Sequence, residues 1–518
     1  MRAPPTVLVI GAGHNGLVAA LLLARAGLSV TVLEQAGVAG GAARTERPFA
    51  RAPGLQASTG AYLLGLMPPE LLAATGVELE LLRRDPHYFL PTTDGRYLLF
   101  GADAESTRRQ LTEFFSAADF AASQAMEAEL AQLRDDVGPS WLHDPLSIEE
   151  TAERYVRAPL RQVFVDLCRK PVRHYLDRFG WRSDLVRAMY AVTDGFSGVG
   201  GSWDTPGTGM NFLAHNMCRL PGSGGTWMIA KGGMGAVTRA FADKARSHGA
   251  RIELSARVEG VLLDGGTARG VRLADGRELR ADVVLCNADP FRMRELVGRA
   301  RLPDDYNARL DGYLRDGSSF KVNLALRELP RFTCLPEARG QHAATIHLLP
   351  DERDVMRTIA ESHAAVQAGR LADFPTIEWY IHTTVDPSLR DEAGHHSAAL
   401  FVQWVPYALR GTTWEREEAG YVRHLLAICD RFAPGTSDAV VDVFALSPPG
   451  IERHFGITRG HIQHVDNSFG FADRLPYATP IAGLYSCSAG THPAGAVVGA
   501  GGHNAAMKVL RDLGRAAA

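Results

Sequence analysis

VLVIGAGHNGLVAALLLARAGLSVTVLEQAGVAGGAART, residues 7–45, is the stretch that decides the fold. Its apolar and small residues predict a short strand over 7–10, a glycine-rich turn, a helix over 17–26 and a second strand over 29–33. Gly27 ends the predicted helix. This order of elements is typical of a unit that binds a dinucleotide.

Three glycines set the chemistry of the turn. Gly11 permits the tight bend, Gly13 lets the backbone approach a pyrophosphate, and Gly16 lets the helix pack closely on the strand. The start of the helix offers free N–H groups and a partial positive charge to phosphates. Ala12 and Asn15 therefore join the predicted cofactor-binding residues.

An acidic residue ends the second strand. Glu34 stands 18 residues after Gly16 and can accept hydrogen bonds from both hydroxyls of a ribose, with Gln35 beside it. A bare GxGxxG pattern would be weak, because a chain with 53 glycines contains it by chance. The full order of strand, turn, helix, strand and acid is what indicates the dinucleotide site.

A double glycine follows this acid, in the order Gly40, Gly41, Ala42 and then Arg44. A plain NAD-binding domain requires no second glycine pair here, and an ordinary glycine-rich loop is the alternative. The pattern resembles the flavoprotein family of glutathione reductase and the amine oxidases, where the pair lets the chain pass close to the FAD pyrophosphate. The resemblance implies FAD as the cofactor, with Arg44 facing its phosphate or its flavin.

Composition narrows the classes of protein. A chain of 518 residues with 46% hydrophobic residues can form two to four domain-sized units. The net charge of −3 without a long basic run argues against nucleic acid as a main partner. Six scattered cysteines contain no CxxC, so neither a metal site nor a redox disulfide is expected. We expect a cytoplasmic protein, with peripheral attachment to a membrane left open.

The expected fold class is α/β with an α+β substrate region. A Rossmann-type FAD-binding domain of the glutathione reductase and amine oxidase kind is predicted to be discontinuous, over 1–70, 220–300 and 466–518. The remaining chain is predicted to form a helical substrate region over 71–219 and an inserted mixed-sheet substrate domain over 301–465.

A second nucleotide-domain pattern lies in the middle of the chain. A helix over 236–248 precedes short strands between 258 and 280, with a hairpin signal at Asp275-Gly276. A buried strand over 282–287 follows. In the flavoprotein superfamily this arrangement brings the backbone near Val258 to the adenine.

The substrate regions show their own patterns. Helices are expected over 70–82 and 104–138, and the glycine-rich but apolar segment 195–235 is expected to be ordered and to line a cavity. Strands are expected over 318–326, 376–384, 398–405 and 440–446. Because these segments are rich in apolar and aromatic residues, we expect an apolar substrate cavity.

The tail carries a third motif, GLYSCSAGTHPAGAVVGAGG over 483–502. It predicts a strand over 484–488, a loop that begins at Gly490, and a helix that begins near Val497 and Val498. The start of such a helix favours negative charge, which suits the electron-rich end of a flavin ring.

The chain as a whole resembles the phytoene desaturase family of FAD-dependent carotenoid desaturases and isomerases, within its phytoene-dehydrogenase-like subgroup. The motifs that carry this resemblance are the glycine turn, DVVLCNADP at 282–290, IERHFGITRGHIQH at 451–464 and the tail. The subgroup usually has a double glycine where Arg459-Gly460 stands here. The resemblance is weakest over 85–195. It implies hydride removal from an apolar, lipid- or isoprenoid-like substrate to flavin N5, with oxygen, a quinone or NAD(P) as the electron acceptor.

The sequence offers no unambiguous catalytic base. His492, Tyr62 and Lys321 are weak candidates, and each has a plainer interpretation. These are a loop-capping histidine, a buried aromatic residue and an outward, solvated lysine. His382 and His464 are likewise each open to a catalytic and to a structural interpretation.

Two other functions remain open. An amine oxidase shares the same nucleotide-binding half, and would show an aromatic cage and a polar group for the amine beside the ring. A flavoprotein that acts as a binding or regulatory partner would keep FAD as a structural element. The shaped tail favours an enzyme, because a purely structural FAD needs no shaped flavin end.

Overall fold

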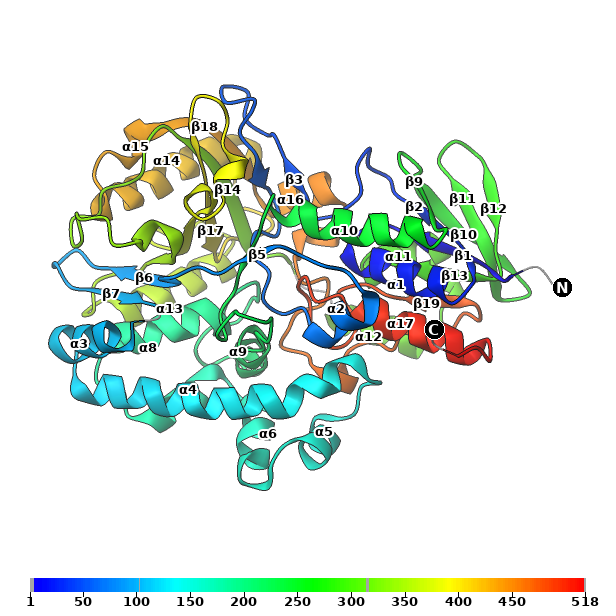
Figure 1. Cartoon of the computed structure of the whole chain (residues 1–518), viewed down its shortest axis with the longest axis horizontal. Coiled ribbons are helices and arrows are strands. Elements are labelled where there is room, and N and C mark those ends of the chain that lie inside the picture. The colour runs from blue at the N-terminus through cyan, green and yellow to red at the C-terminus, as the bar shows by residue number, and fades with distance from the viewer. Residues whose placement is uncertain (1–3, 102, 314–315, 517–518) are drawn as a thin grey trace.

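In this computed structural model, which describes residues 4–101, 103–313 and 316–516, two large sheets form two parts of one molecule (Figure 1). The smaller sheet and its covering helices lie at the right of the view, the larger sheet at the upper left, and a group of helices below it. The predicted fold class is confirmed: a Rossmann-like sheet is combined with a mixed-sheet substrate domain.

The first sheet is parallel and gathers strands from three distant parts of the chain. Its central strand is β1, whose residues pair with β2 on one side and β13 on the other. The strand order is β19 (Leu484–Ser486), β13 (Val283–Cys286), β1 (Thr6–Ile10), β2 (Ser29–Leu33) and β9 (Arg251–Glu253). The carboxyl ends of these strands form the edge at which α/β folds bind nucleotides.

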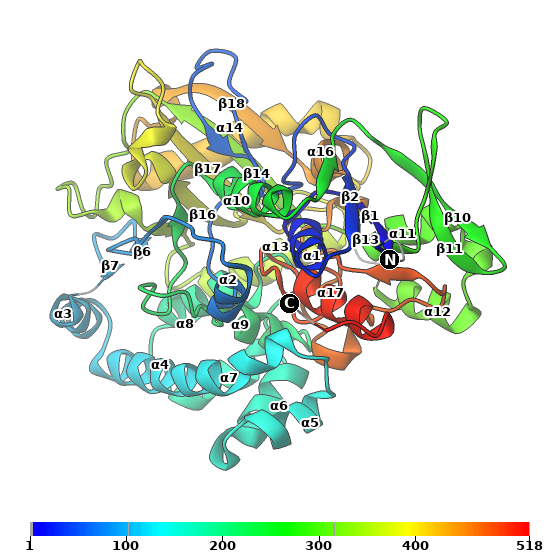
Figure 2. The ribbon, with the colours of Figure 1, turned by 45° about the vertical axis from the view of Figure 1, so that its right-hand side comes forward.

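Three helices cover one face of this sheet: α1 (His14–Arg25), α10 (Met234–Ser247) and α17 (Ala500–Asp512). Both overall views show α17 beside α1 (Figures 1 and 2). The two helices approach very closely, because a Cβ atom on Gly502 would lie 2.0 Å from the carbonyl oxygen of Asn15. The small residues in the tail motif therefore let α17 pack closely against α1.

The predicted meander forms a small antiparallel sheet of β10 (Val258–Asp264), β11 (Thr267–Leu273) and β12 (Glu278–Arg280). The helices α11 (Pro290–Val297) and α12 (Asp304–Tyr313) follow it in the chain.

The second sheet has seven strands and is mixed, because β15 and β6 run parallel while the other neighbours are antiparallel. Helix α14 (Trp414–Phe432) packs on its apolar face, over a core that includes Phe320, Val322 and Leu400. The strand order is β18 (Val440–Leu446), β14 (Ser319–Leu326), β17 (His396–Gln403), β16 (Thr376–Ile381), β15 (Thr345–Leu348), β6 (Tyr88–Pro91) and β7 (Tyr97–Phe100).

The helices beneath this sheet share one hydrophobic core. They are α3 (Ala104–Phe114), α4 (Ala117–Val137), α5 (Ile148–Tyr155), α6 (Arg161–Arg169), α7 (Val172–Leu176), α8 (Asp184–Tyr190) and α9 (Thr208–His215). Smaller elements are β3 (Thr45–Glu46), β4 (Ala57–Ser58), β8 (Ile229–Ala230), α13 (Val355–Gln367), α15 (Thr436–Ala439) and α16 (Pro448–Phe455). Among the described residues, no helix is both long enough and apolar enough to cross a bilayer.

Several predicted boundaries are wrong. The helix expected over 70–82 is α2 (Pro69–Thr75), which a left-handed Gly76 ends before β5 (Leu81–Leu82). The helix expected over 104–138 is two helices, because the Ser116 side chain caps a new start. The region 71–219, predicted to be helical, also contributes β6 and β7 to the large sheet.

Candidate functional site

One cavity of about 800 Å³ connects the glycine-rich turn of β1 and α1 to a face of the seven-stranded sheet. Its walls come from widely separated segments, including α1, the loop after the double glycine, the meander, the large sheet and the segment 451–464. The residues predicted to bind the cofactor and those predicted to face the substrate therefore border a single space.

The first turn has no room for side chains. Gly11 has a left-handed φ of +93°, which favours glycine. A Cβ atom on Gly13 would lie 2.8 Å from Nδ2 of Asn287, and one on Gly16 would lie 2.4 Å from the carbonyl oxygen of Gly11. Gly13 caps α1 without a side-chain hydrogen bond, and Gly11, Gly13 and Asn15 line the cavity.

Glu34 lies at the cavity wall and is only 6% exposed. Its carboxylate accepts hydrogen bonds from the N–H of Ala12 (2.7 Å) and the N–H of Ala36 (2.9 Å). The acid thus braces the turn as well as facing the cavity, a role that the sequence alone did not show. Gln35 also lines the cavity, whereas Ala12 lies behind the wall.

The double glycine packs directly on the first turn. The N–H of Gly40 donates to the carbonyl of Ala12 (2.9 Å), and a Cβ atom on Gly41 would lie 3.2 Å from Cα of Gly13. Gly41 and Ala42 line the cavity, while Gly40 lies behind them. The double glycine therefore continues the side-chain-free backbone surface that begins at the first turn.

Arg44 does not line the cavity, contrary to the prediction that it faces the phosphate or the flavin. Its guanidinium lies 3.2 Å from the carboxylate of Glu46 and 4.9 Å from the ring centre of Phe455. It also donates to the carbonyl of His454. Arg44 instead fixes α16 over the double-glycine loop, which spacing in the sequence could not reveal.

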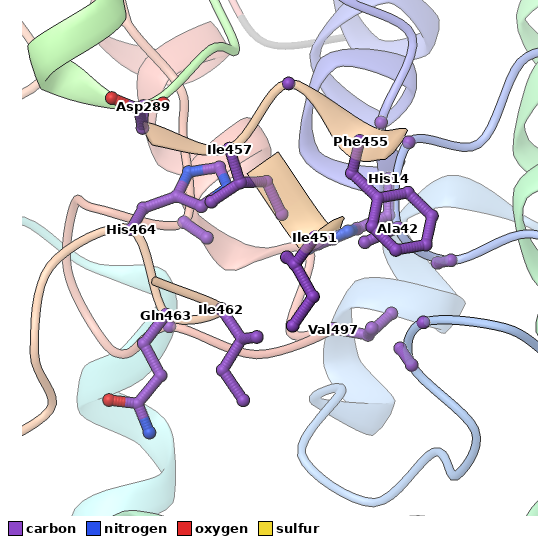
Figure 3. A pocket seen from close by; sticks show the side chains of 18 of the residues that line it. His14, Ala42, Asp289, Ile451, Phe455, Ile457, Ile462, Gln463, His464 and Val497 are labelled. Carbon is purple, nitrogen blue, oxygen red and sulfur yellow. The ribbon is translucent and has the colours of Figure 1, made fainter. Parts of the chain in front are cut away.

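The segment 451–464 covers this part of the cavity. Figure 3 shows Phe455 beside His14 and Ala42, with Ile451 above Val497. His464, which the sequence left open, also lines the cavity. The segment is held down where the carboxylate of Asp289 accepts hydrogen bonds from the N–H (3.0 Å) and the hydroxyl (2.9 Å) of Thr458.

The tail lines the cavity with residues that differ in part from the predicted ones, namely Ala489, Gly495, Ala496 and Val497. Val497 lines the cavity, as does Val258 from the meander. Val498 is 1% exposed and packs in the core of the helical region, because α17 begins only at Ala500. Gly490 lies behind the wall, where a Cβ atom would meet the ring of Pro290 at 3.0 Å.

His492 is not a cavity residue. Its ring is buried, its Nε2 lies 3.3 Å from the carbonyl oxygen of Ser140, and it packs 5.4 Å from the ring centre of Phe471. Burial lowers the pKa of His492 to about 4. The plainer interpretation, a structural histidine in the loop, fits these contacts.

One face of the large sheet is polar and buried, and it forms the far wall of the cavity. The strand register places Lys321, Phe401, Glu378 and His347 in one row across four strands. Side chains on successive residues point to opposite faces, so the apolar residues between them pack under α14. Buried polar groups are costly without partners, which makes this face a candidate for binding.

Lys321 has an unusual environment. It is 4% exposed, and its Nζ has no hydrogen-bond partner among the described residues. The amine lies 3.3 Å from the ring centre of Tyr62, which also lines the cavity. Burial lowers the pKa of Lys321 well below its ordinary value, although Glu378 opposes the shift. The prediction of an outward, solvated lysine is therefore wrong.

Aromatic rings flank this amine. The ring of Tyr62 lies 4.5 Å from that of Tyr380 and 6.1 Å from that of Phe401. The hydroxyl of Tyr380 donates to the carboxyl of Glu378, and Nε2 of His347 lies 3.6 Å from the other oxygen of that carboxyl. An aromatic group and a carboxyl thus adjoin each other at the cavity wall.

His382 and Arg84 support this wall from behind. His382 stacks on Tyr380, with ring centres 6.0 Å apart, and does not line the cavity. Arg84 is buried and donates to the hydroxyl of Thr345 (2.6 Å) and the carbonyl of Trp227 (3.0 Å). The segment 195–235 contributes Trp227 to the lining, together with Ser197 and His215.

Residues 16–354, more than half of the chain, match the family described as "Flavin containing amine oxidoreductase". The chain belongs to this family. It is a flavin-type oxidoreductase by that membership, as the glycine turns and the tail motif predicted. The narrower resemblance to phytoene desaturases stays a prediction.

Individual relatives agree with this assignment. "Pyridine nucleotide-disulfide oxidoreductase domain-containing protein 2" of Mus musculus is 34% identical over 98% of this chain and 93% of its own length. A "zeta-carotene-forming phytoene desaturase" of Myxococcus xanthus is 31% identical over 56% of this chain and 55% of its own. A solved oxidoreductase of Methanosarcina mazei shares the fold, with a TM-score of 0.61 at 18% identity, over 98% of this chain and all of that one.

Proposed function

We propose that the protein is an FAD-dependent dehydrogenase or oxidase whose substrate has an apolar body and one hydrogen-bonding group. The cavity fits FAD, because the backbone at Gly13 and Gly41 has no room for side chains and so presents a bare surface that a pyrophosphate can approach. Glu34 and Val258 would hold the adenosine, the start of α1 the pyrophosphate, and Val497 the flavin ring.

A bound FAD would supply the hydride acceptor, while the protein orients the substrate and excludes water. Tyr62, Phe401 and Trp227 offer apolar surface to the body of the substrate. The Lys321 amine, held at a lowered pKa, can donate a hydrogen bond to a polar group without first losing a full hydration shell. Glu378 can accept a hydrogen bond at the same wall.

The observation that carries this proposal is the buried polar face of the sheet. A wholly hydrocarbon substrate would exclude water from Lys321, Ser319 and Glu378 and would not replace the hydrogen bonds that water can make with them. Each buried polar group left without a partner costs about 1–3 kcal/mol. The expectation of an apolar cavity is thus modified: the aromatic residues are present, but a polar wall stands among them.

The desaturase interpretation retains support from its relatives, including the phytoene desaturase of Myxococcus xanthus. An amine is favoured as the polar group by the rings of Tyr62, Tyr380 and Phe401 beside the carboxyl of Glu378. Both substrates fit the same general reaction, the removal of hydride from carbon. They differ in whether a nitrogen or oxygen atom adjoins that carbon.

Matched probes separate these substrates. The purified holoprotein is mixed without oxygen with 1-octylamine, 1-octanol or 1-octene, three eight-carbon chains that differ only at one end. We expect the amine or the alcohol to bleach the flavin absorbance and the alkene to leave it unchanged. Bleaching by 1-octene alone would assign a hydrocarbon substrate and contradict the proposal.

A further inference from the structure

A second polar group faces the cavity from the helical region, opposite the large sheet. Asp194 lies in a single π-helical turn, Ala191–Gly195, that directly follows α8, and His215 is the last residue of α9. Oδ1 of Asp194 lies 3.9 Å from Nδ1 of His215. Both side chains line the same cavity as Lys321 and Tyr62.

The fold holds this turn in place. The buried amide of Asn211 donates to two of its carbonyls, those of Asp194 (2.8 Å) and Gly195 (3.2 Å), and to that of Ser197 just after it (3.0 Å). The side chain of Asn216 donates to Oδ2 of Asp194 (3.1 Å). A π-helical turn is rare and is frequently found at functional sites. The turn thus sets Asp194 at the cavity rather than in a regular helix.

The surroundings of the pair favour the neutral form of both groups. Burial raises the pKa of Asp194 to about 8, and lowers the pKa of His215 to about 4. Between these two values the carboxyl keeps its proton and the imidazole is neutral. Pairs of titratable groups whose environments push their pKa values apart are typical of acid–base sites.

Charged and titratable groups reach the pair from several elements. Glu378 on β16 and Glu127 on α4 add to the upward shift of the Asp194 pKa, while Asn216 and Arg134 oppose it. Glu378 also acts on His215, in the direction that raises its pKa. Tyr88 on β6 and Tyr190 on α8 face the same carboxyl. Burial outweighs these contributions for both members of the pair.

We propose that Asp194 and His215 form the acid–base pair that binds the N–H or O–H group of the substrate and takes its proton. This inference rests on the proposed function. As the C–H bond breaks, its hydrogen would leave with both electrons as hydride, for which the FAD of the proposed function would be the acceptor, and the N–H or O–H proton passes to the imidazole of His215. The substrate gains a C=N or C=O bond, so atoms and electrons balance. The new imidazolium faces the Asp194 carboxyl, whose own proton is then lost more readily.

The pair also supplies the base that the sequence did not name. His492, the sequence candidate, is turned toward Ser140, outside the cavity. His215, by contrast, has 13% of its side chain exposed, and it borders the cavity. His215 is thus a neutral imidazole at the cavity wall that can accept a proton, with the Asp194 carboxyl 3.9 Å from its Nδ1.

The first test needs no substrate. Infrared difference spectra of the holoprotein are recorded as the pH is changed across 8, for the wild type, Asp194→Asn and the surface control Asp204→Asn. We expect the carbonyl band of a protonated carboxyl group near neutral pH, which disappears above pH 8 and is absent only from Asp194→Asn. If the wild type shows no band that depends on Asp194, the carboxyl is already ionised and the pair is excluded.

The second test uses whichever eight-carbon probe bleaches the wild-type flavin. We expect Asp194→Asn and His215→Gln to slow bleaching by about 100-fold or more and to change its pH profile, with FAD content unchanged. An unchanged rate and pH profile in both variants would overturn the inference. If no probe bleaches the flavin while the Asp194 band titrates as expected, the proposed function fails and the proton-holding pair stands.

Discussion

Lys321 is the residue on which the substrate proposal most depends. Its amine lies on the ring of Tyr62, unpartnered among the described residues, in the cavity that also holds the cofactor site. Lys321→Met keeps the chain length and removes the polar atom. We expect flavin reduction by the effective probe to slow by about 100-fold, as when a preorganised donor is removed. Stopped-flow absorbance measures it.

Lys231→Met is the matched control for this change. Lys231 lies on the surface, with about half of its side chain exposed and its amine 2.8 Å from Glu80. Its replacement should leave the rate of flavin reduction within twofold, about the scatter expected of a surface substitution. Equal slowing in both lysine variants would mean that the Lys321 effect is not local.

The same lysine should also affect stability. An unfolded lysine has a pKa of about 10.4, whereas burial lowers the pKa of Lys321 well below this value. Below pH 10 the unfolded state therefore binds more protons at this residue, so stability is reduced at neutral pH and recovers as the pH rises. Lys321→Met should raise the Tm at pH 7 and raise it less at pH 9. Thermal unfolding at both values tests this, and a lower Tm for the variant at both would contradict it.

The residues that line the cavity were easiest to predict where backbone chemistry dictates their position. Gly11, Gly13 and Glu34 line the cavity because turn geometry and strand order fix them. Arg44 and Val498 were misplaced, since spacing along a loop does not say to which side a side chain points. The alternation of polar and apolar residues in 319–326 contains the signal for a buried, cavity-facing Lys321.

At the scale of elements, α1 and α17 pack with no room for a side chain between them. A Cβ atom on Gly502 would lie 2.0 Å from the carbonyl oxygen of Asn15. Gly502→Ala should therefore push the helices apart, lower stability by about 1–3 kcal/mol and weaken FAD binding. Urea unfolding and flavin release measure both effects.

Gly312→Ala provides the control for this substitution. Gly312 lies in α12, and a Cβ atom there would meet nothing within 4 Å. Alanine should raise stability by about 0.5–1 kcal/mol, because it is the better helix former. If Gly502→Ala is as stable as Gly312→Ala and keeps its FAD, the close packing of α17 on α1 is not needed for the site.

Element types were easier to predict than their ends. The strand–turn–helix unit and the meander follow from apolar periodicity and turn residues, and both are present. The π-helical turn at 191–195 and the strands β6 and β7 were missed. Both strands are short, and β6 joins the sheet through β15, which is far away in the sequence, while β7 pairs only with β6. No local pattern identifies β15 as the partner.

At the scale of the whole molecule, the central feature is one cavity between the two sheets. Segments near both ends of the chain and from its middle build the parallel sheet, and the large sheet closes the cavity from the other side. The motif order predicted that distant segments would meet. The polar character of the far wall could not be predicted, because it depends on which face of each strand the pairing turns inward.

The most direct test is the flavin content of the purified protein. The protein is denatured, the released cofactor is separated and identified by mass, and its amount is compared with that of the chain. We predict one molecule of non-covalent FAD per chain for the wild type, and little or none for Gly13→Val, whose side chain would fill the space of the pyrophosphate. A wild-type protein that releases no flavin, or releases NAD(P) in its place, would contradict this account of the cavity.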